Sequence, residues 1–137
     1  MSPTTLQKTI YLRATPEKVW SYLTDPDKLA IWFHKPPSAL TEGPYEMYGS
    51  ESGDKLMWGD VTVCEPFKRL HYSFSIAPMA GATSRVKWTL DEVDGGTRLS
   101  LTHEDLPQGA EAFGLVLALD KGWDDHLARL RADAHAP

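Results

Sequence analysis

The side chains best suited to chemistry in this sequence are His103 and Tyr72, which lie in extended segments rich in large apolar residues. A neutral imidazole near pH 7 can orient a carbonyl group of a ligand or act as a general base. Alternation along a strand places Glu104 on the opposite face, so its carboxylate cannot orient the ring and no catalytic set is assembled. The pattern favours a buried histidine that is hydrogen-bonded to Tyr72 or to a backbone carbonyl.

Other residues that could hold a metal or a cofactor are few. The five histidines include no pair at the spacing of helical metal ligands, and no element carries two histidines with a carboxylate. Cys64, the one cysteine, has no cationic neighbour in its segment, which is typical of a structural thiol, and it excludes an internal disulfide. The sequence holds no glycine-rich phosphate loop and no Gly-x-Ser-x-Gly elbow. We therefore expect no metal and no cofactor.

The elements that must position these residues begin with one strand and two short helices. Apolar side chains at alternate positions of residues 6–12 predict the strand. Residues 15–17 (Thr-Pro-Glu) and 25–27 (Asp-Pro-Asp) each combine a capping side chain, a proline at the first helical position and an acid near the positive helix end. Each motif predicts the start of a short helix. Residues 34–43, with two prolines, predict a loop.

Residues 45–103 predict a meander of antiparallel strands separated by short turns. With an Asp-Gly turn in the last hairpin, Trp88 faces Leu101 on one side and Asp91 faces Arg98 on the other. Apolar pairs on one face and opposite charges on the other are typical of a half-buried antiparallel sheet.

Alternation in the middle of the meander places Val61 and Val63 together on the inner face. The same alternation turns Trp58 outward, where it has no evident role. Trp20, by contrast, is expected to pack the first short helix against the core.

The last element is a helix from about residue 110 to 134, because its apolar residues recur at spacings of three and four. Its second half is amphipathic, and the run Asp124-Asp125-His126 is expected on the solvated face. Its first half is apolar on all sides, so a curved sheet is expected to wrap it.

Composition excludes several function classes. The chain has 137 residues and a formal net charge of -5, which argues against binding to duplex nucleic acid or to anionic lipid. The longest apolar run, residues 113–119, falls far short of a membrane span, and no secretory signal is visible. We expect a single domain over residues 1–137 in a soluble, cytoplasmic protein.

The sequence also resembles a known family. Residues 14–33 (ATPEKVWSYLTDPDKLAIWF) are similar to the opening of the activator of heat shock protein 90 ATPase homologue (AHSA-type) family, within the SRPBCC or START-like superfamily that includes birch-pollen-allergen-like domains. Further matches follow in order at residues 59–66, 69–74, 84–90, 96–103 and 122–130, so the resemblance covers about residues 6–132. It implies an α+β helix-grip fold, in which a curved antiparallel sheet wraps a long C-terminal helix and two short helices follow the first strand.

The resemblance implies function less narrowly than fold. Superfamily members enclose a cavity between sheet and long helix, and many bind lipids, polyketides or other apolar molecules. We therefore expect a domain that binds an apolar or aromatic small molecule of lipid-, polyketide- or flavonoid-like chemistry without a cofactor. Two alternatives stay open, namely a chaperone ATPase activator-like interaction protein and a cofactor-free cyclase- or hydrolase-like enzyme using His103 and Tyr72. A monomer or weak homodimer is expected, without nucleic-acid binding or membrane insertion.

The candidate ligand-binding residues are large side chains expected between the sheet and the long helix. They are Trp32, Phe33, Tyr45, Met47, Tyr72, Phe74, Trp88, Leu101, His103, Phe113, Leu117 and Trp123. Periodicity alone favours interdigitation of these side chains into a filled core, whereas the resemblance implies a cavity among them.

Overall fold

The computed structural model describes residues 4–49 and 51–136. The predicted domain also takes in residues 1–3, 50 and 137, which lie outside the described residues. In chain order the elements are β1 (Thr4–Leu12), α1 (Pro16–Thr24), α2 (Pro26–Trp32), β2 (Gly43–Tyr48), β3 (Lys55–Glu65), β4 (Arg69–Phe74), η1 (Ala77–Met79), β5 (Ser84–Val93), β6 (Gly96–Leu106), η2 (Ala110–Ala112) and α3 (Phe113–Ala134). Within the described ranges, no helix is long and apolar enough to cross a membrane.

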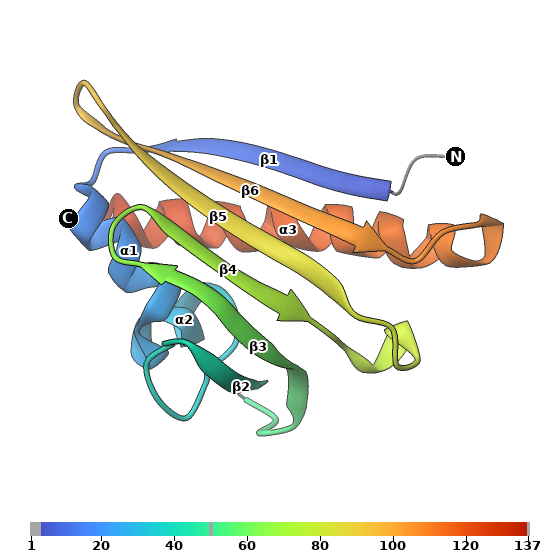
Figure 1. The fold of residues 1–137 in the computed structure, drawn as a ribbon. Coiled ribbons are helices and arrows are strands. Elements are labelled where there is room, and N and C mark those ends of the chain that lie inside the picture. Colours follow the sequence, from blue (N-terminus) through green and yellow to red (C-terminus); the bar gives the residue numbers. More distant parts are fainter. Residues whose placement is uncertain (1–3, 50, 137) are drawn as a thin grey trace.

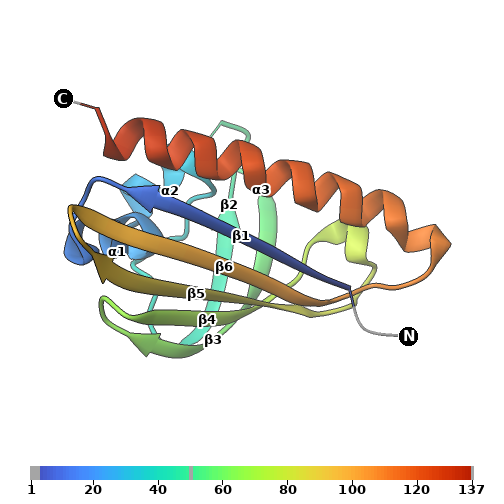
Figure 2. The same ribbon diagram turned by 90° about the horizontal axis from the view of Figure 1, so that it is seen from above.

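The strands form one antiparallel sheet in the order β1-β6-β5-β4-β3-β2. The sheet is curved, and α3 lies along its concave side while α1 and α2 pack near one end (Figures 1 and 2). This arrangement is the helix-grip fold predicted from the sequence.

The two short helices begin where the capping motifs predict. The Thr15 hydroxyl accepts a hydrogen bond from the Lys18 backbone N–H at 3.2 Å, and the Asp25 carboxylate accepts one from the Asp27 N–H at 2.9 Å. A proline occupies the first turn of each helix, where its missing N–H costs no hydrogen bond. The Asp25 cap sets where α2 begins, and the last residue of this helix, Trp32, lies in the interior.

The β5–β6 hairpin has the predicted register. Trp88 pairs with Leu101, and both side chains are buried on the inner face. On the outer face, Asp91 pairs with Arg98, whose guanidinium lies 3.2 Å from the carboxylate. The hairpin therefore presents its apolar side to α3.

The predicted placement of Val63 is wrong because β3 contains a bulge. The register with β4 shifts between Val61 and Val63, so that Val63 pairs with His71 of the outer face. Val61 keeps its inward position, and Cys64 replaces Val63 as the side chain packed against the core. A bulge sets two residues opposite one and so reverses the alternation that follows.

Trp58 lies on the outer face, half-buried, between the inward-facing neighbours Met57 and Gly59 on its strand. The Lys55 ammonium lies 5.1 Å from the centre of its ring. Trp58 therefore holds the Lys55 ammonium over its ring by a cation–π contact, which alternation alone does not reveal.

Candidate ligand-binding site

A cluster of aromatic rings occupies the space between the sheet and α3. Trp88 of β5 meets Trp32 of α2 edge to face at 5.9 Å between ring centres, and meets Trp123 of α3 in the same way at 5.6 Å. All three indoles are almost fully buried. The structure thus brings together the three tryptophans that the sequence places on three different elements.

Phe33 joins this cluster at its edge. It directly follows α2, and its ring stacks on Trp32 at 5.1 Å and on Trp123 at 5.3 Å. The half-buried ring of His34 stacks on the same phenylalanine at 4.5 Å. The cluster therefore reaches from the interior toward the surface through Phe33 and His34.

The predicted tyrosines, with Met47, Phe74 and Leu101, are buried in the same core. Tyr72 accepts a hydrogen bond from the Trp88 indole at 3.0 Å, and Tyr45 donates one to the Ser73 carbonyl at 2.6 Å. Burial raises the pKa of both phenols, so each remains protonated in the folded protein. They act as fixed hydrogen-bonding groups of the core.

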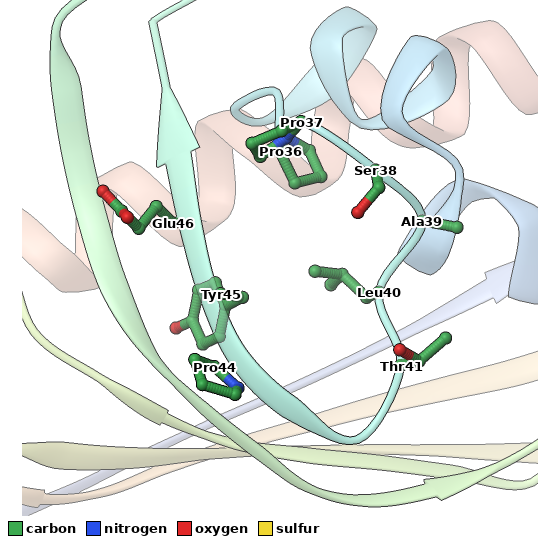
Figure 3. Close-up of a pocket in the computed structure, with 9 residues that line it drawn as sticks. All are labelled: Pro36, Pro37, Ser38, Ala39, Leu40, Thr41, Pro44, Tyr45 and Glu46. Atoms are coloured by element: carbon green, nitrogen blue, oxygen red, sulfur yellow. The ribbon is translucent and has the colours of Figure 1, made fainter.

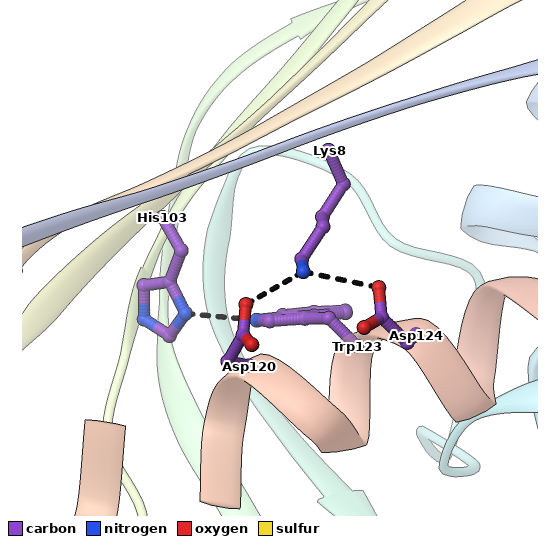
Figure 4. A network of polar contacts seen from close by, with 5 residues as sticks. All are labelled: Lys8, His103, Asp120, Trp123 and Asp124. Atoms are coloured by element: carbon purple, nitrogen blue, oxygen red, sulfur yellow. Dashed lines mark hydrogen bonds and ion pairs between the residues drawn. The ribbon is translucent and has the colours of Figure 1, made fainter. Parts of the chain in front are cut away.

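His103 is fully buried, and both of its ring nitrogens have partners, of which Figure 4 shows Trp123. Trp123 Nε1 lies 3.0 Å from Nδ1, and Ser84 Oγ lies 2.7 Å from Nε2. The expectation that Tyr72 or a backbone carbonyl satisfies the ring is wrong, because its two partners are the side chains of Trp123 and Ser84. Burial lowers the pKa of His103 to about 4, so the ring is neutral at pH 7.

The tautomer of His103 follows from its partners. An indole N–H can only donate, so Nδ1 carries a lone pair and Nε2 carries the proton. Nε2 then donates to Ser84 Oγ, whose own hydrogen is donated to the Phe74 carbonyl at 3.0 Å. A general base for Ser84 would need its lone pair on Nε2. This geometry fits a structural histidine and gives the enzyme alternative no support.

Lys8 is a charged residue of the inner face that the sequence reasoning missed. Its ammonium lies 2.6 Å from Asp120 and 3.0 Å from Asp124, both on α3 (Figure 4). Burial lowers the pKa of Lys8, but the hydrogen bonds to the two carboxylates outweigh it and leave the pKa above its usual value. Its even position between Leu6 and Ile10 was the available signal. The contact ties the edge strand β1 to α3.

The run Asp124-Asp125-His126 is only partly solvated, in contrast to the prediction. Asp125 pairs with Lys121 at the surface, whereas Asp124 faces Lys8. His126 is half-buried, and its Nδ1 donates to the Trp32 carbonyl at 2.9 Å. Because a helix turns about 100° per residue, three successive side chains cannot share one face.

Phe113 and Leu117 do not join the cluster, although both were predicted to close a pocket. Their side chains are 58% and 55% exposed. On the same turns of α3, Val116 is buried, and Leu115 and Leu119 pack partly buried against the core. The sheet covers only one side of the first half of α3. The prediction that the sheet wraps this half of the helix on all sides is therefore wrong.

Several hollows lie at the surface around this core. One of about 210 Å³ lies between the loop after α2 and strand β2 (Figure 3). It is lined by Pro36, Pro37, Ser38, Ala39, Leu40, Thr41, Pro44, Tyr45 and Glu46. A larger one of about 880 Å³ lies over the outer face of β3, β4 and β5. Neither is lined by Trp88 or Trp123, whose own neighbourhood is filled by the packed rings of the cluster.

A curved antiparallel sheet closed over a long C-terminal helix, with an aromatic core between them, defines a helix-grip domain of the SRPBCC class. The family described as "Activator of Hsp90 ATPase homolog 1-like protein" matches residues 13–133, and the chain belongs to this family. No curated protein matches the chain.

Solved structures with the same fold include proteins from several bacteria. CalU16 from Micromonospora echinospora is 26% identical with a TM-score of 0.78, and the match covers 97% of this chain and 77% of CalU16. DynU16, a putative protein in the dynemicin biosynthetic locus, is 26% identical with a TM-score of 0.80 over 93% of this chain, which spans only 46% of DynU16. The Aha1 dimer from Colwellia psychrerythraea, at 20% identity, a TM-score of 0.76 and 93% coverage of each chain, shares the fold.

Proposed function

We propose that this domain binds an apolar or aromatic small molecule, of lipid-, polyketide- or flavonoid-like chemistry, between the sheet and α3. The observation that carries the proposal is the position of Phe33, whose ring is stacked against both Trp32 and Trp123 at the edge of the buried cluster. A planar ligand could occupy the same slot and make the same contacts.

Phe33 is well placed to give way to such a ligand. It follows the last residue of α2 and precedes an irregular segment, so its side chain can turn outward without breaking the sheet or α3. The slot that it leaves is bounded by two indoles, and each aromatic contact is worth about 0.5–1.5 kcal/mol beyond area burial. Binding would thus exchange one ring for another.

Polar groups near this slot could orient the ligand. His34 and His126 lie in ring contact at 5.4 Å beside Phe33. Burial, followed by the charges of His126 and Arg129, lowers the pKa of His34 to about 4, so its imidazole is neutral at pH 7 and able to donate or accept one hydrogen bond. A mostly apolar site with a few polar groups is typical of small-molecule pockets. The placement of DynU16 in a biosynthetic locus is in keeping with this role.

The test is a titration of tryptophan fluorescence with three probes, namely anilinonaphthalene sulfonate, palmitate and quercetin. We expect at least one probe to change the emission, and Phe33→Ala to tighten its binding about tenfold because no ring has to be displaced. Phe67→Ala is the matched control, since Phe67 also packs its ring against a tryptophan, Trp20, but outside the cluster. The proposal fails if no probe alters the emission of either the native protein or a folded Phe33→Ala variant.

A further inference from the structure

The first half of α3 carries an uncharged strip at the surface. Residues 113–119 contain no charged side chain, in a chain of which 24% of residues are charged. Phe113 and Leu117 are one helical turn apart and more than half exposed, and Gly114 and Ala118 beside them are exposed as well. Neighbouring exposed apolar side chains form one continuous apolar surface, and surfaces of this kind are candidates for protein contacts.

The strip has a shape that can pack on a copy of itself. A Cβ atom built on Gly114 would meet nothing within 4 Å, so the surface is open there, next to the projecting Leu117. Consider two antiparallel α3 helices related by a two-fold axis that crosses each helix at the level between residues 115 and 116. Leu117 of each copy then faces Gly114 of the other copy. Large side chains then meet small ones on both halves of the contact.

Charge favours the same arrangement. Glu111 and Lys121 are exposed near the two ends of the strip. In the antiparallel pair, Glu111 approaches the partner's Lys121 at each end, whereas a parallel pair would set like charges together. Lys121 already contacts Asp125 of its own helix at 2.8 Å, but this is an exposed pair that is easily exchanged. Because the chain carries a net charge of -5, an uncharged strip is where two copies repel one another least.

We propose that this uncharged strip, residues 113–119 of α3, with Glu111 and Lys121 beyond its two ends, is the surface on which a second copy of the chain docks in antiparallel orientation. The contact centres on only two large apolar side chains per copy, so the dimer is weak and forms at high micromolar concentration. The dimer leaves the aromatic cluster intact, because Val116 and Trp123 face the opposite side of the same helix. It does not depend on the proposed ligand.

The test is sedimentation velocity of the full chain over a range of concentrations up to about 1 mM. We expect a monomer–dimer equilibrium, and Leu117→Arg raises its Kd more than tenfold. Ile31→Arg is the matched control, because Ile31 is a helical aliphatic residue of similar exposure, 49%, on α2. A native chain that stays monomeric at every concentration overturns the proposal, as does an equal effect of the control.

Three further single variants and one double variant test the orientation of the two helices. Gly114→Leu raises the helical propensity of α3 and so the melting temperature, yet it fills the space that receives the partner's Leu117 and weakens the dimer. Glu111→Lys and Lys121→Glu each raise the Kd, and the two together restore it, because the reversed charges meet again across the two-fold axis. Failure of the double variant to restore the dimer excludes the antiparallel register.

Discussion

The indole Nε1 of Trp123 lies 3.0 Å from Nδ1 of His103, which makes this contact the polar link between α3 and the sheet at the centre of the core. The donor can only be the indole, so the contact selects the tautomer of the imidazole with its proton on Nε2, and this N–H donates a hydrogen bond to Ser84 Oγ. The chain of hydrogen bonds ends on the backbone of β4. A group that resembles a catalytic histidine in sequence is thus a fixed part of the core.

Replacing Trp123 with phenylalanine keeps a ring but removes its donor. We expect a loss of about 2–4 kcal/mol in the free energy of unfolding, because Nδ1 of His103 is left buried without a partner and some packing is lost. Urea unfolding followed by circular dichroism measures the change. Trp20→Phe serves as the control, since the Trp20 indole makes no hydrogen bond among the described residues, and it should cost clearly less. Equal losses would contradict the role given to the indole N–H.

The stability of the protein should fall with acid through His103. Its pKa is depressed from 6.5 to about 4 by burial, so between these values the unfolded chain binds a proton that the folded chain does not. The contribution of the neutral ring is complete above pH 6.5 and is lost as the pH falls toward 4. Between pH 7 and pH 5 the native protein should lose about 2 kcal/mol more than His103→Gln does. Parallel pH profiles of urea unfolding for the two proteins would contradict this expectation.

In the contact between Lys8 and α3, removing the ammonium should cost less stability than removing the charge of the two carboxylates. Lys8→Met replaces the ammonium by an apolar group of similar length, and we expect it to cost under about 1 kcal/mol because the two carboxylates remain near water. The double variant Asp120→Asn, Asp124→Asn leaves the ammonium without a countercharge and should cost more. Urea unfolding of the two variants at low salt compares them directly. A larger loss for Lys8→Met would contradict this expectation, because it would mean that the two carboxylates depend on the ammonium more than the ammonium depends on them.

Local patterns account for what the sequence could predict. The caps at Thr15 and Asp25 and the register of Trp88 against Leu101 depend on residues within one helix start or one hairpin, so a short window contains the whole signal. The convergence of the three tryptophans followed because each sits on the apolar side of its own element. The family resemblance then supplied the order of the elements.

What could not be predicted depends on contacts between distant segments or on a break in a pattern. The bulge has no signature in the residues around Val63, so their alternation predicts a regular strand. Ser84 shares its face with Val86 and Trp88, and that parity could have identified it as a partner of His103. An apolar sequence does not by itself show burial. The apolar run at the start of α3 predicts that Phe113 and Leu117 lie inside, whereas both are exposed.

Binding of a small molecule between the sheet and α3 is tested most directly by ¹⁵N–¹H correlation NMR. The spectrum resolves the indole N–H groups of the five tryptophans. Resonances are assigned with single Trp→Phe variants and followed while the best fluorescence probe is added. We predict that the signals of Trp32 and Trp123 shift most, because they line the slot of Phe33, with a smaller shift for Trp88. The indole N–H signals of Trp20 and Trp58, which lie outside the cluster, should not shift. Shifts confined to Trp20 or Trp58, or no shift at all at saturating probe, would contradict the account.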